Sequence, residues 1–317
     1  MIYIQLVGGL VYLLMGGDLL VRGAVALARR ARISPMVVAF SVVAFGTSVP
    51  ELVVTLRASL TGYPGLVLGN VIGSNTANVL LVAGASAVLY PLGGGGGSER
   101  RDAAIMMAAS LGFAGLCFLG ALTQGGGLLL LAGFVSVMVL TLRTTLQAYR
   151  ASDTSIPMDW VLGLPTHLAM IGLFLVAGGV GLPVGASLMV EAAVEIAGRF
   201  GVSDTVVGLT VVAFGTSLPE LATTAVAALQ RRTDVVVGTI IGSNTFNILA
   251  IMGIGAAASP VPIDISERLL TLDLPVMLAA SAVLTICAVT GRKIRRGLGA
   301  LLLGGYVSYM VVLFTRV

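Results

Sequence analysis

The sequence predicts an all-α polytopic membrane protein with ten transmembrane helices, arranged as two inverted five-helix repeats. Three observations carry this prediction. Of the 317 residues, 57% are hydrophobic and 10% are charged, which excludes a water-soluble globular domain. The apolar residues form runs of about 20 or more, enough to cross a bilayer. Two polar motifs then occur twice, 169 residues apart, at Glu51 and again at Glu220.

Ten apolar spans separated by polar breaks predict the helices. The span that ends at residue 198 is long enough for two crossings. We interpret it as one tilted helix kinked at Pro183, because a second crossing would move the later basic loops to the opposite side. The predicted helices cover residues 2–28, 35–60, 66–90, 103–122, 126–147, 160–198, 204–229, 235–258, 270–290 and 297–315.

The basic residues predict the orientation. Three lie on the face that carries the even loops and both termini: Arg199, Arg268 and Arg316. Thirteen lie in the loops after helices 1, 3, 5, 7 and 9: Arg29, Arg30, Arg32, Arg100, Arg101, Arg143, Arg150, Arg231, Arg232, Arg292, Lys293, Arg295 and Arg296. Cytoplasmic loops are enriched in Lys and Arg. We therefore expect a multi-pass protein with both termini outside, in a prokaryotic inner (plasma) membrane, since the loops are short and targeting segments are missing.

The repeat predicts the domain organisation. Residues 42–52 and 211–221 are nearly identical, and residues 72–78 match 241–247 at the same offset. Five crossings separate the copies, and an odd number reverses their direction through the membrane, as in secondary transporters. We expect a first repeat over 1–149 (helices 1–5, with its motif in helices 2–3), a cytoplasmic linker over 150–159, and a second repeat over 160–317 (helices 6–10, with its motif in helices 7–8).

Each copy places a carboxylate near the middle of the bilayer. Glu51 and Glu220 lie about halfway along their spans, where a charge costs at least about 2.5 kcal/mol and marks a functional site. Pro50 and Pro219 precede them and interrupt the helix, which exposes backbone carbonyls that can bind ions. A bundle duplicated only for packing would not require these glutamates to be duplicated.

Hydroxyl and amide side chains accompany each glutamate. Thr47 and Ser48 share a helix face with Glu51, and Thr216 and Ser217 repeat this spacing before Glu220. Helices 3 and 8 add two further pairs with a spacing of four residues, Ser74 with Asn78 and Ser243 with Asn247. Gly69, Gly73, Gly238 and Gly242 are expected to let neighbouring backbones approach. An all-oxygen pocket without His or Cys selects a hard cation, and Ca²⁺ fits best.

The paired Gly-Thr-Ser-x-Pro-Glu and Gly-Ser-Asn motifs resemble the two alpha-repeats of the sodium/calcium exchanger branch of the cation/calcium antiporter superfamily. The resemblance covers the whole chain and implies sodium/calcium antiport by alternating access, with helices 1 and 6 sliding as a gating pair. It implies no cofactor, with Ca²⁺ and Na⁺ as the transported ions. It also implies that the ions are bound by Thr47, Ser48, Glu51, Ser74, Asn78, Thr216, Ser217, Glu220, Ser243 and Asn247, with help from the carbonyls of Ala44 and Ala213.

One departure concerns Asn247. Several prokaryotic and potassium-dependent members of the superfamily carry Asp there, so this site has two carboxylates rather than three. That argues against potassium cotransport and leaves the stoichiometry open. The alternative function is an antiporter that exchanges calcium or another divalent cation for protons, using the same glutamates.

Other function classes fit the sequence less well. An enzyme would need a base beside Ser48 or Ser217, and no His or Lys lies near the motifs. A channel would surround an axis with like subunits. We therefore expect a transporter with ions and lipid as its partners, no nucleic acid, and no obligate protein partner, because one chain supplies both half-sites.

Several remaining polar residues are interpreted as structural. The sequence places Asp18 four residues before Arg22, and Glu195 four residues before Arg199, so both are expected to form local ion pairs. His167 is expected to be interfacial, and Cys117 and Cys287 to be buried and inert.

Overall fold

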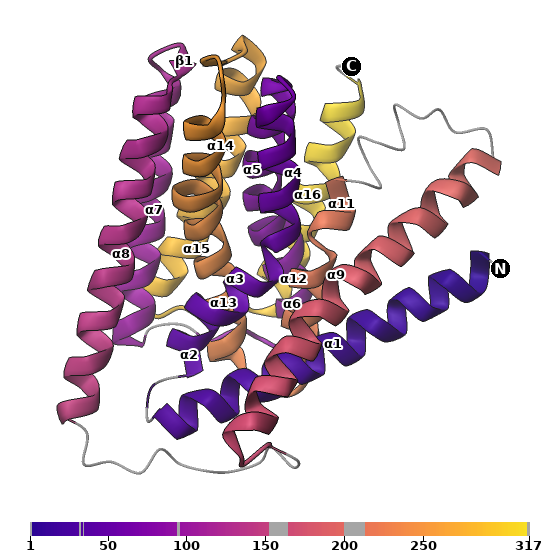
Figure 1. Ribbon diagram of the computed structural model, residues 1–317, viewed down its shortest axis with the longest axis vertical. Coiled ribbons are helices and arrows are strands. Elements are labelled where there is room, and N and C mark those ends of the chain that lie inside the picture. Colours follow the sequence, from indigo (N-terminus) through magenta and orange to yellow (C-terminus); the bar gives the residue numbers. More distant parts are fainter. Residues whose placement is uncertain are drawn as a thin grey trace.

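The computed structural model describes residues 2–31, 33, 35–93, 96–151, 164–199 and 213–315. These residues are almost entirely helical (Figure 1). The first half contains α1 (Ile2–Ala31), α2 (Pro35–Val38), η1 (Ala39–Val43), α3 (Ala44–Thr47), α4 (Val49–Leu60), α5 (Pro64–Ala77), η2 (Asn78–Ala83), α6 (Gly84–Leu89), α7 (Gly97–Cys117), β1 (Ala121–Leu122) and α8 (Gln124–Ala151). The elements named η are short π-helical turns within longer helices.

The second half repeats the order of the long helices, but β2 and η5 precede α15, whereas β1 follows α7. It contains α9 (Leu168–Arg199), α11 (Ala213–Thr216), α12 (Leu218–Leu229), α13 (Thr233–Phe246), η4 (Asn247–Ile251), α14 (Met252–Ala258), β2 (Ile263–Asp264), η5 (Leu269–Asp273), α15 (Leu274–Thr290) and α16 (Arg296–Thr315). The bounds of α12 and α13 lie 169 residues after those of α4 and α5. The π-helical turns begin at equivalent residues, Asn78 and Asn247.

The helices account for the predicted crossings. In the described part of the chain, 7 helices are long and apolar enough to cross a membrane, and a bent pair over 39–60 makes 8. The other two predicted spans correspond to α7 and to the shorter apolar helix α12. Residues 204–212, which begin the span predicted before α12, lie outside the described residues.

The structure decides two predictions about the spans, the single crossing at Pro183 and the bounds of the fourth helix. Helix α9 continues through Pro183 as a single helix, so its stretch is one span rather than two; residues 160–163 lie outside the described part. The bounds 103–122 were wrong at both ends. The helix begins at Gly97 because Glu99 Oε2 accepts a hydrogen bond from the Gly96 N–H at 3.3 Å, which caps it within polar residues. It ends before Gly120, whose φ of 88° opens a turn.

The two halves pack through exchanged contacts. Helix α8 of the first half packs on α14 of the second, and α16 of the second packs in the equivalent way on α6 of the first. Both outer helices, α8 and α16, expose apolar side chains, among them Leu128, Leu129, Leu301 and Val307, as expected for surfaces that face lipid.

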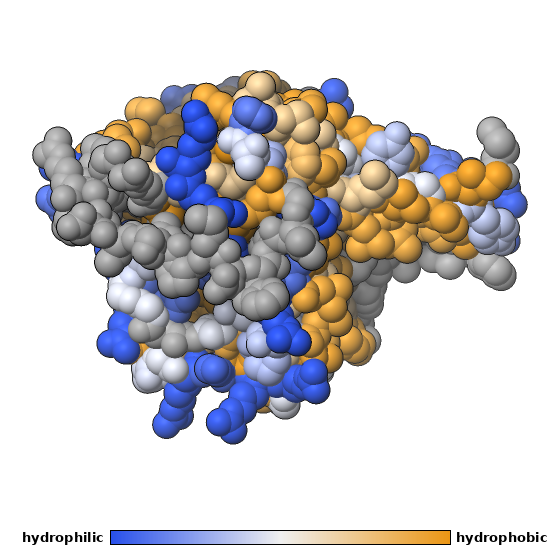
Figure 2. All heavy atoms as spheres, turned by 90° about the horizontal axis from the view of Figure 1, so that it is seen from below, coloured by the Kyte–Doolittle hydropathy of each residue, from blue (hydrophilic) through white to orange (hydrophobic). Residues whose placement is uncertain are grey.

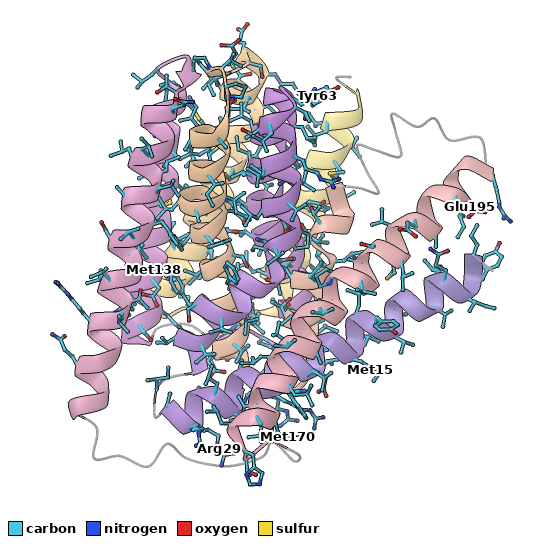
Figure 3. The ribbon with its side chains drawn as sticks, viewed as in Figure 1. Met15, Arg29, Tyr63, Met138, Met170 and Glu195 are labelled. Atoms are coloured by element: carbon cyan, nitrogen blue, oxygen red, sulfur yellow. The ribbon has the colours of Figure 1, made fainter. Side chains whose placement is uncertain are left out.

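The connections alternate between two ends of the molecule. Strands β1 and β2 pair antiparallel and join two even loops, while a bridge between Leu92 and Ile294 joins two odd loops. Figure 3 places Tyr63, in an even loop, and Arg29, before an odd one, at opposite ends. Figure 2 views the Arg29 end, where hydrophilic side chains project from the face. This is the alternation that ten crossings require.

Helices α1 and α9 form a separate inclined pair. They lie side by side and lean away from the other helices (Figure 1). Glycines permit their close approach: a Cβ at Gly178 would lie 2.7 Å from the carbonyl oxygen of Gly16, and one at Gly185 would lie 2.8 Å from that of Gly9. Small residues at such interfaces let helix backbones pack directly within a membrane.

Candidate ion-binding site

Both motif helices break at a serine three residues before the glutamate, Ser48 in the first repeat and Ser217 in the second. The helices before and after Ser48 are inclined by 54°. Ser48 (φ −89°, ψ 7°) and Ser217 (φ −88°, ψ 0°) have the same backbone conformation. The cause lies in Pro50 and Pro219, which lack an N–H and clash with a carbonyl of the preceding turn. Each break makes the glutamate part of the first turn of a new helix.

Glu51 and Glu220 are both buried, with 1% of their surface exposed. Each lies at a helix N-terminus, where free N–H groups favour a negative charge. The two carboxylates are close enough to repel one another. In the described part of the chain no group of three or more His, Cys, Asp or Glu side chains could hold a metal. Within the described residues, this pair and neutral oxygens are therefore the groups available to a cation.

Hydroxyls of the first repeat reach the glutamate of the second. Ser48 Oγ donates to Glu220 Oε1 at 3.2 Å, and the Thr47 side chain also interacts with Glu220. The Thr47 hydroxyl lies 3.3 Å from the carbonyl oxygen of Ala44, which also accepts the N–H of Ser48 at 3.1 Å. The two motifs thus meet across the interface between the halves.

Several buried oxygens at this interface have no hydrogen-bond partner among the described residues. Leaving such a group unsatisfied costs about 1–3 kcal/mol, and more for a charged one. A cation that accepts lone pairs from these atoms would recover that energy. Six belong to the predicted site: Oε2 of Glu51 and Glu220, Oδ1 of Asn78 and Asn247, and Oγ of Ser217 and Ser243.

The remaining predicted residues lie around this group. Ser74 and Thr216 line a cavity of about 430 Å³, which reaches to Gly65 and Arg268 at the end of the molecule with the even loops. Ala213 is the first residue of α11, but its side chain is outside the described part. The structure therefore places Ser74 and Thr216 beside this cavity, whereas both glutamates are buried and do not line it.

The glycines of the two repeats differ in their surroundings. A Cβ on Gly242 would overlap the Phe40 carbonyl oxygen and lie 2.8 Å from Ala44 Cβ, so α13 contacts η1 and α3 directly. Among the described residues, Gly73, its counterpart, has nothing within 4 Å, and it lines the cavity, as does Gly69. The expectation of close backbone approach is confirmed at Gly242; at Gly73 it stays a prediction, because residue 209, the counterpart of Phe40, lies outside the described residues.

Sequence reasoning did not single out Asn75 and Asn244. Both are buried, and their side chains bond across the interface between the repeats to Asn247 and Asn78. The signal was available, because both lie within the segment copied at 72–78 and 241–247.

The polar residues interpreted as structural lie elsewhere. The local ion pairs are confirmed, with 2.7 Å between Arg22 Nε and Asp18 Oδ2 and 2.8 Å between Arg199 and Glu195. Figure 3 shows Glu195 at the far end of α9. Asp18 also accepts a hydrogen bond from Gln230 Nε2 at 2.6 Å, which links α1 to the end of α12. Both cysteines are buried.

Comparison with known proteins gives concordant matches. The family model described as "Sodium/calcium exchanger protein" matches residues 1–143 and 170–315. The putative antiporter CaxA of Alkalimonas amylolytica is 37% identical over 97% of both chains. Sodium/calcium exchanger MaX1 of Methanosarcina acetivorans is 34% identical over 98% of both. A solved structure of the sodium-calcium exchanger NCX_Mj, soaked with Na⁺ and Sr²⁺, superposes with a TM-score of 0.82 at 29% identity, covering 97% of this chain and 96% of that one.

Proposed function

This chain belongs to the sodium/calcium exchanger family of multi-pass cation/calcium antiporters, which are not enzymes, and from that premise we propose that it exchanges Na⁺ for Ca²⁺ at a site between Glu51 and Glu220. One observation carries the proposal: one oxygen of each buried carboxylate and four neutral side-chain oxygens have no hydrogen-bond partner among the described residues. Ca²⁺ takes six to eight oxygen ligands. Two negative charges neutralise one such ion, and several Na⁺ ions can share the same oxygens.

Electrostatics supports obligatory exchange. In an empty site the two carboxylates would repel one another in a poorly solvated environment. Conversion between the two access states without bound cations is therefore disfavoured, and each ion that leaves must be replaced. We propose that Thr47, Ser48, Ser74, Asn78, Thr216, Ser217, Ser243 and Asn247 complete the site, with the carbonyls of Ala44 and Ala213.

Alternating access is proposed to follow the asymmetry between the repeats. The cavity beside Ser74 opens toward the even loops, whereas the equivalent position in the second repeat is closed by Gly242 against Phe40. With the basic odd loops in the cytoplasm, this conformation is open to the outside and both termini lie outside. Sliding of α1 and α9 over the remaining helices would close the cavity beside Ser74 and open the equivalent position in the second repeat.

The organisation proposed for the chain follows from the same repeat. Residues 1–149 and 160–317 form the two inverted units and 150–159 the cytoplasmic linker, most of which is outside the described residues. One chain supplies both glutamates, so a monomer suffices. Relatives from a bacterium and an archaeon support a prokaryotic plasma membrane.

Proton coupling is the second candidate. Two adjacent buried carboxylates can bind two protons in exchange for one Ca²⁺. The Gly-Thr-Ser-x-Pro-Glu motifs, which carry the resemblance to sodium-coupled exchangers, favour Na⁺.

Uptake of calcium-45 into proteoliposomes separates these alternatives. Vesicles loaded with Na⁺ are compared with vesicles loaded with choline, and with choline vesicles that carry a pH gradient. Uptake that requires internal Na⁺ supports the proposal, whereas uptake driven by the pH gradient alone would replace it with proton antiport. Glu51→Gln and Glu220→Gln should each abolish uptake. Glu195→Gln, on a side chain 56% exposed, is the matched control and should transport normally.

A further inference from the structure

The four buried asparagines of the two Gly-Ser-Asn motifs form a closed set of hydrogen bonds across the interface between the repeats. Asn78 Nδ2 donates to Asn244 Oδ1 at 3.0 Å, and Asn247 Nδ2 donates to Asn75 Oδ1 at 3.1 Å. Each bond joins one repeat to the other, and each is the pseudo-symmetric copy of its partner.

Backbone carbonyls fix the direction of every bond in this set. Asn75 Nδ2 faces the carbonyl oxygen of Asn244 at 3.5 Å, and Asn244 Nδ2 faces that of Asn75 at 3.4 Å. A backbone carbonyl only accepts hydrogen bonds, so in both residues the amide nitrogen must face it. The Oδ1 atoms of Asn75 and Asn244 must then point the other way, toward Asn247 and Asn78.

The consequence reaches the predicted ion ligands. Asn78 and Asn247 can meet an oxygen only with their NH₂ groups, since the flipped amide would place two oxygens together. Their own Oδ1 atoms are thereby turned away from the network. Both of these Oδ1 atoms are buried and have no hydrogen-bond partner in the described part of the chain. They are the atoms that a cation requires.

We propose that Asn75 and Asn244 are positioning residues, which hold the amides of Asn247 and Asn78 with a carbonyl oxygen rather than an NH₂ group directed at the cation. This inference rests on the proposed function, because it assumes that a cation binds beside Asn78 and Asn247. An amide without such a partner can turn over, and it then presents a donor that repels Ca²⁺ or Na⁺. When neighbouring hydrogen bonds already hold a ligand side chain in place, ion binding does not cost the conformational entropy of ordering it.

The arrangement also gives a reason for Asn at position 247. A carboxylate there would have no N–H to donate to Asn75 Oδ1, so Asn75 would have to give up either that contact or the one to the Asn244 carbonyl. A chain that keeps Asn75 in this orientation therefore favours Asn247 and a site with two carboxylates.

The test is a double-mutant cycle on the full-length protein. Equilibrium binding of calcium-45 to purified protein in detergent gives the Kd for the wild type, Asn244→Ala, Asn78→Asp and the double variant. A carboxylate at position 78 offers an oxygen in either orientation, so it needs no positioning. We expect Asn244→Ala to raise the Kd about tenfold or more in the wild-type background and less than about threefold in the Asn78→Asp background. Asn75→Ala with Asn247→Asp repeats the cycle in the other half.

Each outcome decides the proposal. An equal rise of Kd in both backgrounds, or no rise, would show that the asparagines only pack the interface. If neither Asn244→Ala nor Asn75→Ala folds, judged by thermal unfolding without Ca²⁺, these asparagines are needed for folding, and the proposal is overturned as well. The binding measurement does not depend on the coupling ion, so wild-type protein that binds Ca²⁺ but does not exchange it for Na⁺ would refute the proposed function and leave this inference standing.

Discussion

Gly242 and Gly73 offer a matched pair of substitutions whose effects should differ through one contact. Both lie inside helices, α13 and α5, at equivalent positions of the repeats. Alanine in a helix interior is favoured over glycine by about 0.8–1 kcal/mol, and this gain applies to both variants. At Gly242 the new methyl would lie 2.8 Å from Ala44 Cβ and from Phe40 Cα and would overlap the Phe40 carbonyl oxygen. At Gly73 it would meet none of the described residues within 4 Å.

The difference between the variants is therefore the cost of overpacking. Forcing extra methyl groups into a packed interface costs about 1–3 kcal/mol, and about 2 kcal/mol corresponds to roughly a 30-fold change in an equilibrium constant. We expect Gly242→Ala to unfold at a lower temperature than Gly73→Ala when both are heated in detergent without Ca²⁺. Gly73→Ala should match or exceed the wild type.

Transport should separate the variants in a second way. If the opposite access state brings Gly73 into contact as Gly242 is now, Gly73→Ala should slow calcium-45 uptake although its stability is unimpaired. Equal unfolding temperatures for the two variants, or a lower one for Gly73→Ala, would refute the reasoning from the contacts.

Three further predictions concern the ion site. Ser48→Ala removes the hydroxyl that donates to Glu220, a bond to a charged group worth about 1.5–3 kcal/mol, and should weaken Ca²⁺ binding more than tenfold; equal Kd values for Ser48→Ala and wild type would contradict this. Asn247→Asp adds a third carboxylate and should tighten binding of Ca²⁺ relative to Na⁺, measured as the Na⁺ concentration that halves bound calcium-45; an unchanged value would exclude Asn247 as a ligand. Protons and Ca²⁺ compete for Glu51 and Glu220, so the Kd for Ca²⁺ should rise as pH falls, and a Kd independent of pH from 8 to about 5 would place the ion elsewhere.

The site residues could be predicted because their chemistry is local. A glutamate after a proline in the middle of an apolar span is unusual whatever the tertiary structure is. Because this pattern occurs twice, it identified Glu51 and Glu220. The membrane crossings could likewise be predicted from local hydropathy, except where a helix extends into polar residues. Helix α7 began early because Glu99 caps it, and no apolar run records that.

What could not be predicted depends on how the two copies meet. The sequence treats Gly73 and Gly242 alike, yet one lines a cavity and the other touches Phe40. Likewise, Asn75 and Asn244 look like other small polar residues of a helix until the opposing backbone carbonyl fixes their orientation. Such differences belong to the conformation and to contacts between residues of opposite halves, far apart in the sequence.

The exchanged packing of α8 on α14 and of α16 on α6 has a consequence for biogenesis. Neither half can cover its own outer helix, so the first half leaves the ribosome with surfaces that have no partner until the second half has been inserted. Two separately translated halves, divided between α8 and α9, would each present one helix of both pairs, α8 with α14 and α16 with α6. Assembly of the protein therefore depends on contacts between two halves that share an order of helices and differ in most of their sequence.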